Sequence, residues 1–290
     1  MINAEKIIQK IWGNIPVDYE PLDGGFVNFT YKVRVNNSCF ALRINGSQND
    51  YLGLSRQEEV NVMRIAGEMG IAPKVMPQST DEYLITEFID AHTLTHDEIK
   101  QPNIIQNAMD VLKKIHSIQG SDRTFSPFDL VNKHLEGMKA LNIPFPNELE
   151  ALLPESEAAE KRWNDSASYR KAYCHNDYYT FNILNAGGRL YVIDWELSGR
   201  GDIFFDIATI SFHNAFTAGQ DEHMLQCYFG QVEPEHFSAL RDMKYMNMLR
   251  EATWGLLHSG MKEDTVNHNL DYYEHGISTL RRLKEGFLHL

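Results

Sequence analysis

The chain has 290 residues, of which 43% are hydrophobic and 23% are charged. This ordinary globular composition argues against disordered, collagen-like and coiled-coil chains, and the length suits about two domains. Lysine and arginine number 27 against 40 aspartates and glutamates, which gives a formal net charge of −13. An acidic chain repels phosphate backbones, so we expect no nucleic acid partner, whereas its field attracts small cationic molecules.

Cysteine usage and hydropathy favour a cytoplasmic protein. The three cysteines are scattered singly, with neither a zinc-ligand spacing nor a disulfide framework, as expected in a reducing cytosol. The N-terminal segment lacks the long apolar core of a signal peptide. The most apolar stretch, residues 203–218, is interrupted by Asp206 and His213 and is too short to span a bilayer, so we expect no membrane association.

Residues 1–89 predict a small β-rich lobe. The segment Ala4–Trp12 has apolar residues at helical spacing. Alternation over Phe29–Val35 and over residues 39–44, joined by an Asn-Asn-Ser turn, predicts a β-hairpin. Residues 57–70 predict a helix that ends at a glycine, and residues 82–89 predict a short strand.

Residues 90–290 predict a larger, mainly helical lobe. Helical periodicity recurs in residues 104–117, 129–141, 147–165, 237–259 and 269–287. One hairpin interrupts these helices, because residues 182–185 and 189–194 are short apolar runs joined by Ala-Gly-Gly. The sequence therefore predicts an α+β chain of two lobes, divided after residue 89.

The segment from His175 to Asn182, His-Asn-Asp-Tyr-Tyr-Thr-Phe-Asn, has the H-x-D-x-x-x-x-N form of a kinase catalytic loop. Phosphoryl transfer needs a carboxylate that accepts the proton of the attacking hydroxyl. It also needs an oxygen ligand for the Mg²⁺ that bridges the phosphates. We therefore expect Asp177 to be the catalytic base and Asn182 to be a metal ligand, with His175 orienting the loop.

A pair of carboxylates follows this loop. Asp194-Trp-Glu196 comes after the predicted hairpin, at the end of an apolar strand, where kinases place the aspartate that binds Mg²⁺. Aspartate and asparagine also end strands and form Asx-turns, but the combined pattern favours a metal site with Asn182 and Asp194 as ligands. Asp206 lies in an apolar run, where a buried carboxylate needs hydrogen bonds, so we expect it to brace the catalytic loop.

The N-terminal lobe contains groups suited to binding a nucleotide. Gly24 and Gly25, shortly before Asn28, open the first hairpin. Glycines let backbone N–H groups approach phosphates, although a double glycine is also common in simple turns. Arg43 stands in a strand, and Glu59 on the next helix can pair with it, like the lysine–glutamate pair that holds ATP phosphates in kinases. A solvated strand arginine is the alternative.

Glu87, Phe88 and Ile89 end the strand that leads into the helical lobe, and we expect their backbone to pair with adenine. The chain has no G-x-x-x-x-G-K-[ST] segment, which excludes a P-loop enzyme. It also has no recognisable peptide-docking activation loop, and Tyr179 stands where protein-serine kinases have a lysine. These absences favour a small-molecule acceptor.

With these motifs the chain resembles the choline/ethanolamine kinases, especially their bacterial members, within the wider aminoglycoside-phosphotransferase-like group. The matching segments are Gly24-Gly25-x-x-Asn28, Leu42-Arg43-Ile44, Arg56-x-x-Glu59, Gly70-Ile-Ala-Pro73, Thr86-Glu-Phe-Ile89, Cys174-His-Asn-Asp177, Asn182-Ile-Leu184, Ile193-Asp-Trp-Glu196, Phe205-Asp-Ile-Ala208 and Trp254-Gly-Leu-Leu257. The resemblance implies a two-lobed protein-kinase-like fold with ATP and Mg²⁺ bound in its cleft. The strand arginine and the late Trp-Gly-Leu helix are more similar to choline kinases than to antibiotic kinases.

A quaternary ammonium group is recognised by aromatic faces together with a carboxylate. The residues that can supply these groups are Trp195, Trp254, Tyr272 and Tyr273 for the faces, and Glu196 or Asp194 for the charge. Aromatic residues at helical spacing are commonly core residues, so packing inside the protein is the alternative for Trp254.

We therefore expect an ATP- and Mg²⁺-dependent kinase that phosphorylates the hydroxyl of a small amino-alcohol, with choline as the first choice of acceptor. Ethanolamine, thiamine and aminoglycosides are the alternative acceptors. Outside the enzymes, the alternative is a non-catalytic nucleotide-binding protein.

Overall fold

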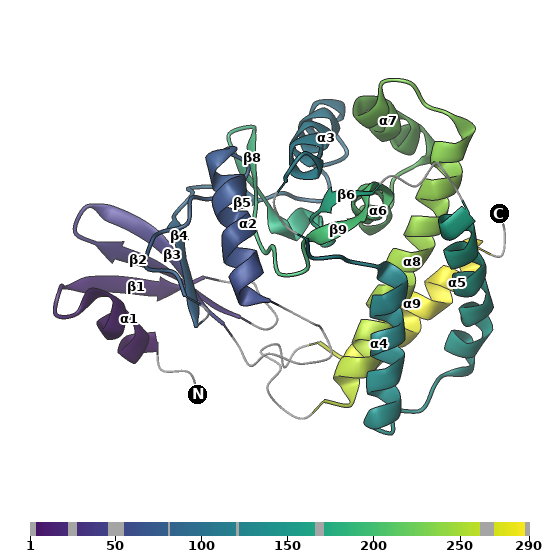
Figure 1. Cartoon of the computed structure of the whole chain (residues 1–290), viewed down its shortest axis with the longest axis horizontal. Coiled ribbons are helices and arrows are strands. Elements are labelled where there is room, and N and C mark those ends of the chain that lie inside the picture. The colour runs from purple at the N-terminus through teal and green to yellow at the C-terminus, as the bar shows by residue number, and fades with distance from the viewer. Residues whose placement is uncertain are drawn as a thin grey trace.

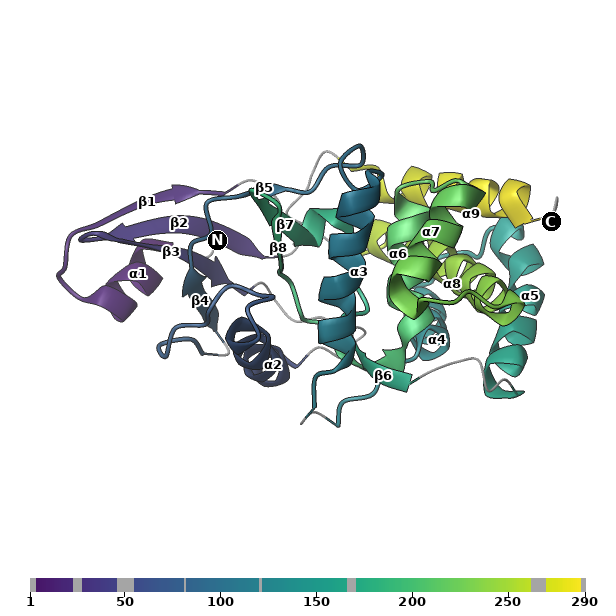
Figure 2. The same ribbon diagram turned by 90° about the horizontal axis from the view of Figure 1, so that it is seen from above.

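The structure is a computed structural model that describes residues 4–22, 28–45, 55–80, 82–119, 122–165, 171–261 and 270–287. An antiparallel sheet lies at one end of the molecule and most of the helices lie at the other (Figures 1 and 2). This arrangement confirms the predicted α+β, protein-kinase-like fold, an N-terminal sheet followed by a mainly helical part.

The N-terminal sheet has four antiparallel strands in the order β1-β2-β3-β4. The elements of this region are α1 (Ala4–Trp12), β1 (Val17–Pro21), β2 (Phe29–Val35), β3 (Ser38–Ile44) and β4 (Tyr83–Glu87). Because side chains alternate across a strand, Val33, Leu42 and Ile85 gather in one cluster, where Ile7 and Ile8 of α1 join them. The sheet thus has a small core of its own.

Helix α2, Arg56–Glu68, connects this sheet to the rest of the protein. The side chain of Ser55 caps its N-terminus by accepting a hydrogen bond from the backbone N–H of Glu58. Its buried residues Val60, Met63 and Ala66 belong to the larger hydrophobic core, which continues into the C-terminal helices. This core contains residues from both sides of residue 89. The division of the chain into two lobes after residue 89 therefore stays a prediction.

The C-terminal part consists of helices and two small sheets, β5-β7-β8 and β6-β9. The helices are α3 (Pro102–His116), α4 (Pro127–Ala140), α5 (Asn147–Asp165), α6 (Ile203–His213), α7 (Ala218–Phe229), α8 (Pro234–Ser259) and α9 (Tyr272–Phe287), with a 3₁₀ turn at Thr180–Asn182. The strands are β5 (His92–Thr93), β6 (Lys171–Cys174), β7 (Ile183–Ala186), β8 (Arg189–Val192) and β9 (Gly199–Asp202). The predicted hairpin is β7 and β8.

Several predicted bounds are confirmed, and two helices were absent from the prediction. Helices α1 and α5 and strand β2 have their expected bounds. Helix α6 lies in the stretch 203–218, where ten consecutive residues from Ile203 to Phe212 are buried. A helix that is buried all round has no apolar stripe, so periodicity cannot reveal it. Helix α7 was missed as well.

In the described part of the chain, no helix combines the length and the apolar composition needed to cross a membrane.

Helices α8 and α9 approach closely at two glycines. A Cβ atom on Gly276 would lie 2.8 Å from Cγ of Leu256, and one on Gly255 would lie 2.9 Å from the carbonyl oxygen of Tyr272. The close approach brings the ring of Tyr272 to within 5.5 Å of the ring of Trp254, measured between centroids.

We expect Gly276→Ala to lower the free energy of unfolding by about 1–3 kcal/mol, because the added methyl group overpacks this contact. The matched control is Gly286→Ala on the same helix, where a Cβ atom would meet nothing within 4 Å. That change should be neutral or stabilise the helix by up to about 1 kcal/mol. Urea unfolding of both variants measures the difference, and equal effects would contradict the close approach.

Candidate active site

The predicted catalytic loop follows strand β6 and is held by a buried aspartate. Asp206, fully buried on α6, accepts hydrogen bonds from the backbone N–H groups of His175 at 2.8 Å and Asn176 at 2.6 Å. Asn176 has φ of 62°, in the left-handed region that asparagine tolerates better than most residues. The bracing role predicted for Asp206 is confirmed.

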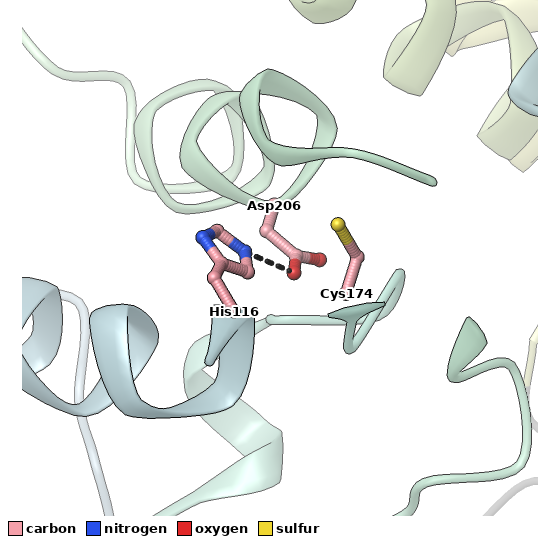
Figure 3. A group of neighbouring side chains, drawn as sticks. All are labelled: His116, Cys174 and Asp206. Carbon is pink, nitrogen blue, oxygen red and sulfur yellow. Dashed lines mark hydrogen bonds and ion pairs between the residues drawn. The ribbon is translucent and has the colours of Figure 1, made fainter. Parts of the chain in front are cut away.

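His116 is a third partner of Asp206. Its Nε2 lies 3.1 Å from Oδ2 of Asp206 (Figure 3). Cys174 lies nearby. A ring nitrogen of His116, the sulfur of Cys174 and a carboxylate oxygen of Asp206 all lie within 4.8 Å of one another. Burial raises the pKa of the Cys174 thiol well above its usual range, which disfavours a metal-binding thiolate. Because the Asp206 carboxylate already accepts the two loop N–H groups, this cluster braces the loop and does not suit a metal ion.

Asp177, the expected base, is held at both carboxylate oxygens. Nδ2 of Asn182 donates to Oδ2 at 2.9 Å, and Nη1 of Arg250 on α8 donates to Oδ1 at 3.1 Å. The second Arg250 nitrogen donates to the hydroxyl of Tyr179 at 2.7 Å. These contacts fix the orientation of the carboxylate before any acceptor binds.

Asp194 lies after strand β8, close to other carboxylates. Its backbone φ is 62°, an uncommon conformation for a non-glycine residue that is typical of functional sites. Burial and the negative charge of Glu196 raise the pKa of the Asp194 carboxyl well above its usual range, even though Arg43 opposes this effect. Excess negative charge of this kind is what a bound divalent cation would relieve.

The two predicted metal ligands fit a hard cation. The side-chain amide of Asn182 donates to Asp177 through Nδ2. Its Oδ1 takes no part in that contact and is the atom that would face a cation. The backbone N–H next to Asp194, that of Ile193, bonds to the backbone oxygen of Asn182 at 2.9 Å, which keeps the two segments adjacent. A carbonyl oxygen and a carboxylate are the donor types that Mg²⁺ prefers.

A buried ion network joins the sheet to this region. Arg43 on β3 forms a two-pronged ion pair with Glu59 on α2, with both nitrogen–oxygen distances at 2.6 Å, and also lies 3.3 Å from Asp194. Arg56 contacts the same Glu59 at 3.1 Å and Glu196 at 2.7 Å. Burial alone would raise the pKa of Glu59, but the two arginines outweigh it and lower the pKa. The expected Arg43–Glu59 pair is therefore present.

The remaining residues expected near the nucleotide have different surroundings. Asn28 is buried and accepts a hydrogen bond from Arg56 at 3.3 Å, so it belongs to the ion network. Glu87 and Phe88 use their backbone N–H groups within the protein, toward Lys74 and Cys39. Adenine would have to pair with other backbone groups here, such as those of the half-buried Ile89. Gly24 and Gly25 lie outside the described residues.

The aromatic residues expected around the acceptor do not all lie together. Trp195 is fully buried, packs against His175 with 4.9 Å between ring centroids, and donates to the carbonyl of Val192. Its position does not support an aromatic face for a ligand, because the indole lies in the core. Trp254 is half-buried on α8, whereas Tyr273 on α9 is 47% exposed.

Sequence reasoning did not connect Arg250 and Glu251 of α8 with the loop residue Tyr179. Glu251 lies 3.4 Å from the hydroxyl of Tyr179 and 3.2 Å from Nε2 of His275. A helix rich in buried residues gives little sign of which charged residue points toward a distant loop. The one available signal is the adjacent pair Arg250-Glu251 shortly before Trp254.

Comparison with known proteins shows which family this chain belongs to. Residues 18–241 match the family described as the phosphotransferase enzyme family. The chain belongs to this family. Protein LicA of Haemophilus influenzae is 24% identical over 267 residues, covering 88% of this chain and 95% of the relative. A probable choline kinase 3 of Arabidopsis thaliana is 26% identical over 227 residues, covering 70% of this chain and 64% of the relative.

Solved structures in the same group share the fold of this phosphotransferase. A choline/ethanolamine kinase family protein from Mesorhizobium loti superposes with a TM-score of 0.81 at 24% identity, covering 97% of this chain and 93% of the other. Choline kinase LicA from Streptococcus pneumoniae superposes with a TM-score of 0.77 at 24% identity, covering 96% of this chain and 99% of the other. The resemblance deduced from the motifs is thus confirmed.

We expect Glu59→Gln to destabilise this phosphotransferase by about 3–5 kcal/mol, because it leaves Arg43 and Arg56 without their shared buried carboxylate. Glu68→Gln, at the exposed end of the same helix, is the matched control and should change stability by less than about 0.5 kcal/mol. Denaturant unfolding measures both. A small effect of Glu59→Gln would show that the network does not hold the sheet in place.

Proposed function

We propose that this phosphotransferase moves the γ-phosphoryl group of ATP to the hydroxyl of a small cationic amino-alcohol, with choline as the acceptor. The observation that supports it most is the Asp177 carboxylate, held at one oxygen by Asn182 and at the other by Arg250, with Asp194 nearby. This combination of a fixed base and two metal-ligand types is what a kinase requires.

In the proposed reaction the acceptor hydroxyl donates its proton to Asp177. The hydroxyl oxygen forms a bond to the γ-phosphorus while the bond from that phosphorus to the β,γ-bridging oxygen breaks, and ADP leaves. Because Arg250 and Asn182 hold the carboxylate, Asp177 does not have to reorient before it accepts the proton. Arg43, fixed by Glu59, would bind the phosphates.

Asn182 and Asp194 would hold Mg²⁺. When bound, this ion neutralises charge on the phosphate oxygens and orients them for transfer. The protein itself keeps the two ligands, Asn182 and Asp194, together through the backbone hydrogen bond from Ile193 to Asn182. It also keeps Arg43 beside Asp194.

Two observations favour a cationic acceptor. The chain carries a net charge of −13, which attracts cations, and Trp254, half-buried on α8, offers aromatic surface. Relatives and structural neighbours include proteins named choline kinase and ethanolamine kinase. Other neighbours are named for aminoglycosides or spectinomycin, so an aminoglycoside belongs in the test.

The direct test is ATP consumption with choline, ethanolamine, thiamine and kanamycin as acceptors, with the product identified by mass spectrometry. We expect phosphocholine and the highest kcat/KM for choline. A higher kcat/KM for another acceptor would replace choline in the proposal. Binding of Mg²⁺-ATP without turnover of any acceptor would instead support a non-catalytic nucleotide-binding protein.

Asp177→Asn should lower kcat by about 10²–10⁴-fold, because the amide cannot accept the hydroxyl proton. The Kd for ATP should stay near its wild-type value, since Asp177 contacts no residue of the Arg43–Glu59 pair. Turnover assays and ATP titration measure the two quantities. Near-normal turnover in this variant would remove the base from the mechanism.

EDTA should abolish phosphorylation, and added Mg²⁺ should restore it. Asn182→Ala should raise the Mg²⁺ concentration for half-maximal activity about 10-fold or more, because one ligand is lost. Asn103→Ala, at an exposed position at the start of α3, should leave this concentration unchanged. The same Mg²⁺ requirement in both variants would exclude Asn182 as a ligand.

A further inference from the structure

The predicted catalytic loop has no positive charge of its own. The segment from His175 to Asn182 contains neither lysine nor arginine, and Tyr179 stands where protein-serine kinases have a lysine. Burial raises the pKa of Tyr179, although Arg250 opposes this effect, so its hydroxyl stays protonated and neutral. Burial also lowers the pKa of His175, which leaves that imidazole uncharged at neutral pH. A cation beside the loop must therefore come from another part of the chain.

Arg250 of α8 brings such a cation to the loop. Its Nη1 donates to Oδ1 of Asp177 at 3.1 Å, and its Nη2 donates to the hydroxyl of Tyr179 at 2.7 Å. The guanidinium carbon lies 5.3 Å from the centroid of the Tyr179 ring. One buried guanidinium thus contacts both the proposed base and the residue in the position of the kinase lysine.

Arg250 keeps its charge in this buried position. Burial by itself would lower the pKa of its guanidinium, but Tyr179 and Asp177 outweigh burial and raise the pKa above its usual range. Negative charge is in excess here, because burial and then the neighbouring carboxylates, Asp177 among them, raise the pKa of Asp194. A permanent cation on Asp177 offsets part of this excess.

The packing of α8 against α6 fixes the place of this guanidinium. Asn247 precedes Arg250 by three residues on α8 and so is its neighbour on the helix surface. Its Nδ2 donates to the carbonyl of Phe205 at 3.0 Å, and its Oδ1 accepts from the hydroxyl of Thr209 at 2.9 Å. Both partners belong to α6, the helix that also carries Asp206. The backbone of the loop and the side chain of Asp177 are therefore held by two helices that are bonded to each other.

The charge of Arg250 has a consequence for phosphoryl transfer. In the proposed reaction the acceptor hydroxyl lies between Asp177 and the γ-phosphorus, so the phosphoryl group moves toward a carboxylate. Like charges repel each other more strongly as they approach, and phosphoryl transfer depends mainly on positioning and electrostatics. A guanidinium bound to that carboxylate reduces the repulsion most where the phosphoryl group is closest, that is, in the transition state.

We propose that Arg250 replaces, from α8, the lysine that the catalytic loop lacks at Tyr179. It acts through Asp177 and Tyr179 and is therefore a positioning residue whose positive charge is required. This inference rests on the proposed function, since it names a further residue on which the same phosphoryl transfer depends.

Arg250→Met removes the charge and keeps a long, unbranched side chain. It should lower kcat about 10²–10³-fold, as the loss of one electrostatic contribution to a transition state does in other enzymes. The kcat/KM should fall by a similar factor with little change in KM, because the effect is exerted in the transition state. Steady-state kinetics with the acceptor that the wild type uses best measure both values.

Tyr179→Lys returns a lysine to the loop. Combined with Arg250→Met, it should raise kcat about 10-fold or more above that of Arg250→Met alone, because two residues that supply one function are coupled. A purely structural role of Arg250 predicts no such gain, since a second change at a buried position adds a second loss of stability. The double variant therefore separates the effect of the charge from an effect of packing.

Arg241→Met, at an exposed position of the same helix, is the matched control and should keep the wild-type kcat. Thermal unfolding and ATP binding establish that each variant is folded. Should Arg250→Met or the double variant not fold, Arg250→Lys and Arg250→Gln take their place. Both keep hydrogen-bond donors and only the first keeps the charge, so Arg250→Lys should then have the higher kcat.

Three results would overturn the role of Arg250 and leave the proposed function intact: a wild-type kcat in folded Arg250→Met, no gain in the folded double variant, or equal kcat values of Arg250→Lys and Arg250→Gln. A wild-type protein that turns over none of the acceptors would overturn the proposed function itself.

Discussion

The position of one buried carboxylate, that of Glu59, determines how the sheet is joined to the rest of this phosphotransferase. Two arginines share it: Arg43 from the sheet and Arg56 from α2. Each arginine also contacts a carboxylate of the segment after β8, Asp194 or Glu196. A fully buried charge is stable only when it is well paired, so the network keeps the sheet, the helix and the segment Asp194–Glu196 in one relative arrangement.

The predicted catalytic loop has a separate support. Asp206 on α6 fixes the loop backbone at His175 and Asn176, and His116 from α3 holds Asp206. Arg250 from α8 then fixes the side chain of Asp177. Asp177, the proposed base, is therefore positioned by polar contacts from three helices. Precise orientation of this kind is needed where phosphoryl transfer depends mainly on positioning and electrostatics.

Local patterns in the sequence could predict much of this site. Asp177 and Asn182 are five positions apart, and the structure joins them directly by a hydrogen bond. Arg43 and Glu59 were expected to pair by analogy with the lysine–glutamate pair of kinases, and the structure joins them. Arg250 is 73 residues from Asp177, and no local pattern connects them. The position of Trp195 was also unpredictable, because its neighbours in the sequence give no sign of the fully buried environment around its ring.

The left-handed backbone at Asp194 limits which residues that position can accept. Its φ of 62° disfavours β-branched and bulky residues, because their side chains clash with the backbone in this conformation. Glycine would adopt the conformation readily but would remove the carboxylate, and asparagine would keep the shape but lose the charge. Aspartate thus combines tolerance of this backbone conformation with a carboxylate, the group that the proposed Mg²⁺ site requires here. A substitution at this position would therefore either strain the backbone or remove the carboxylate.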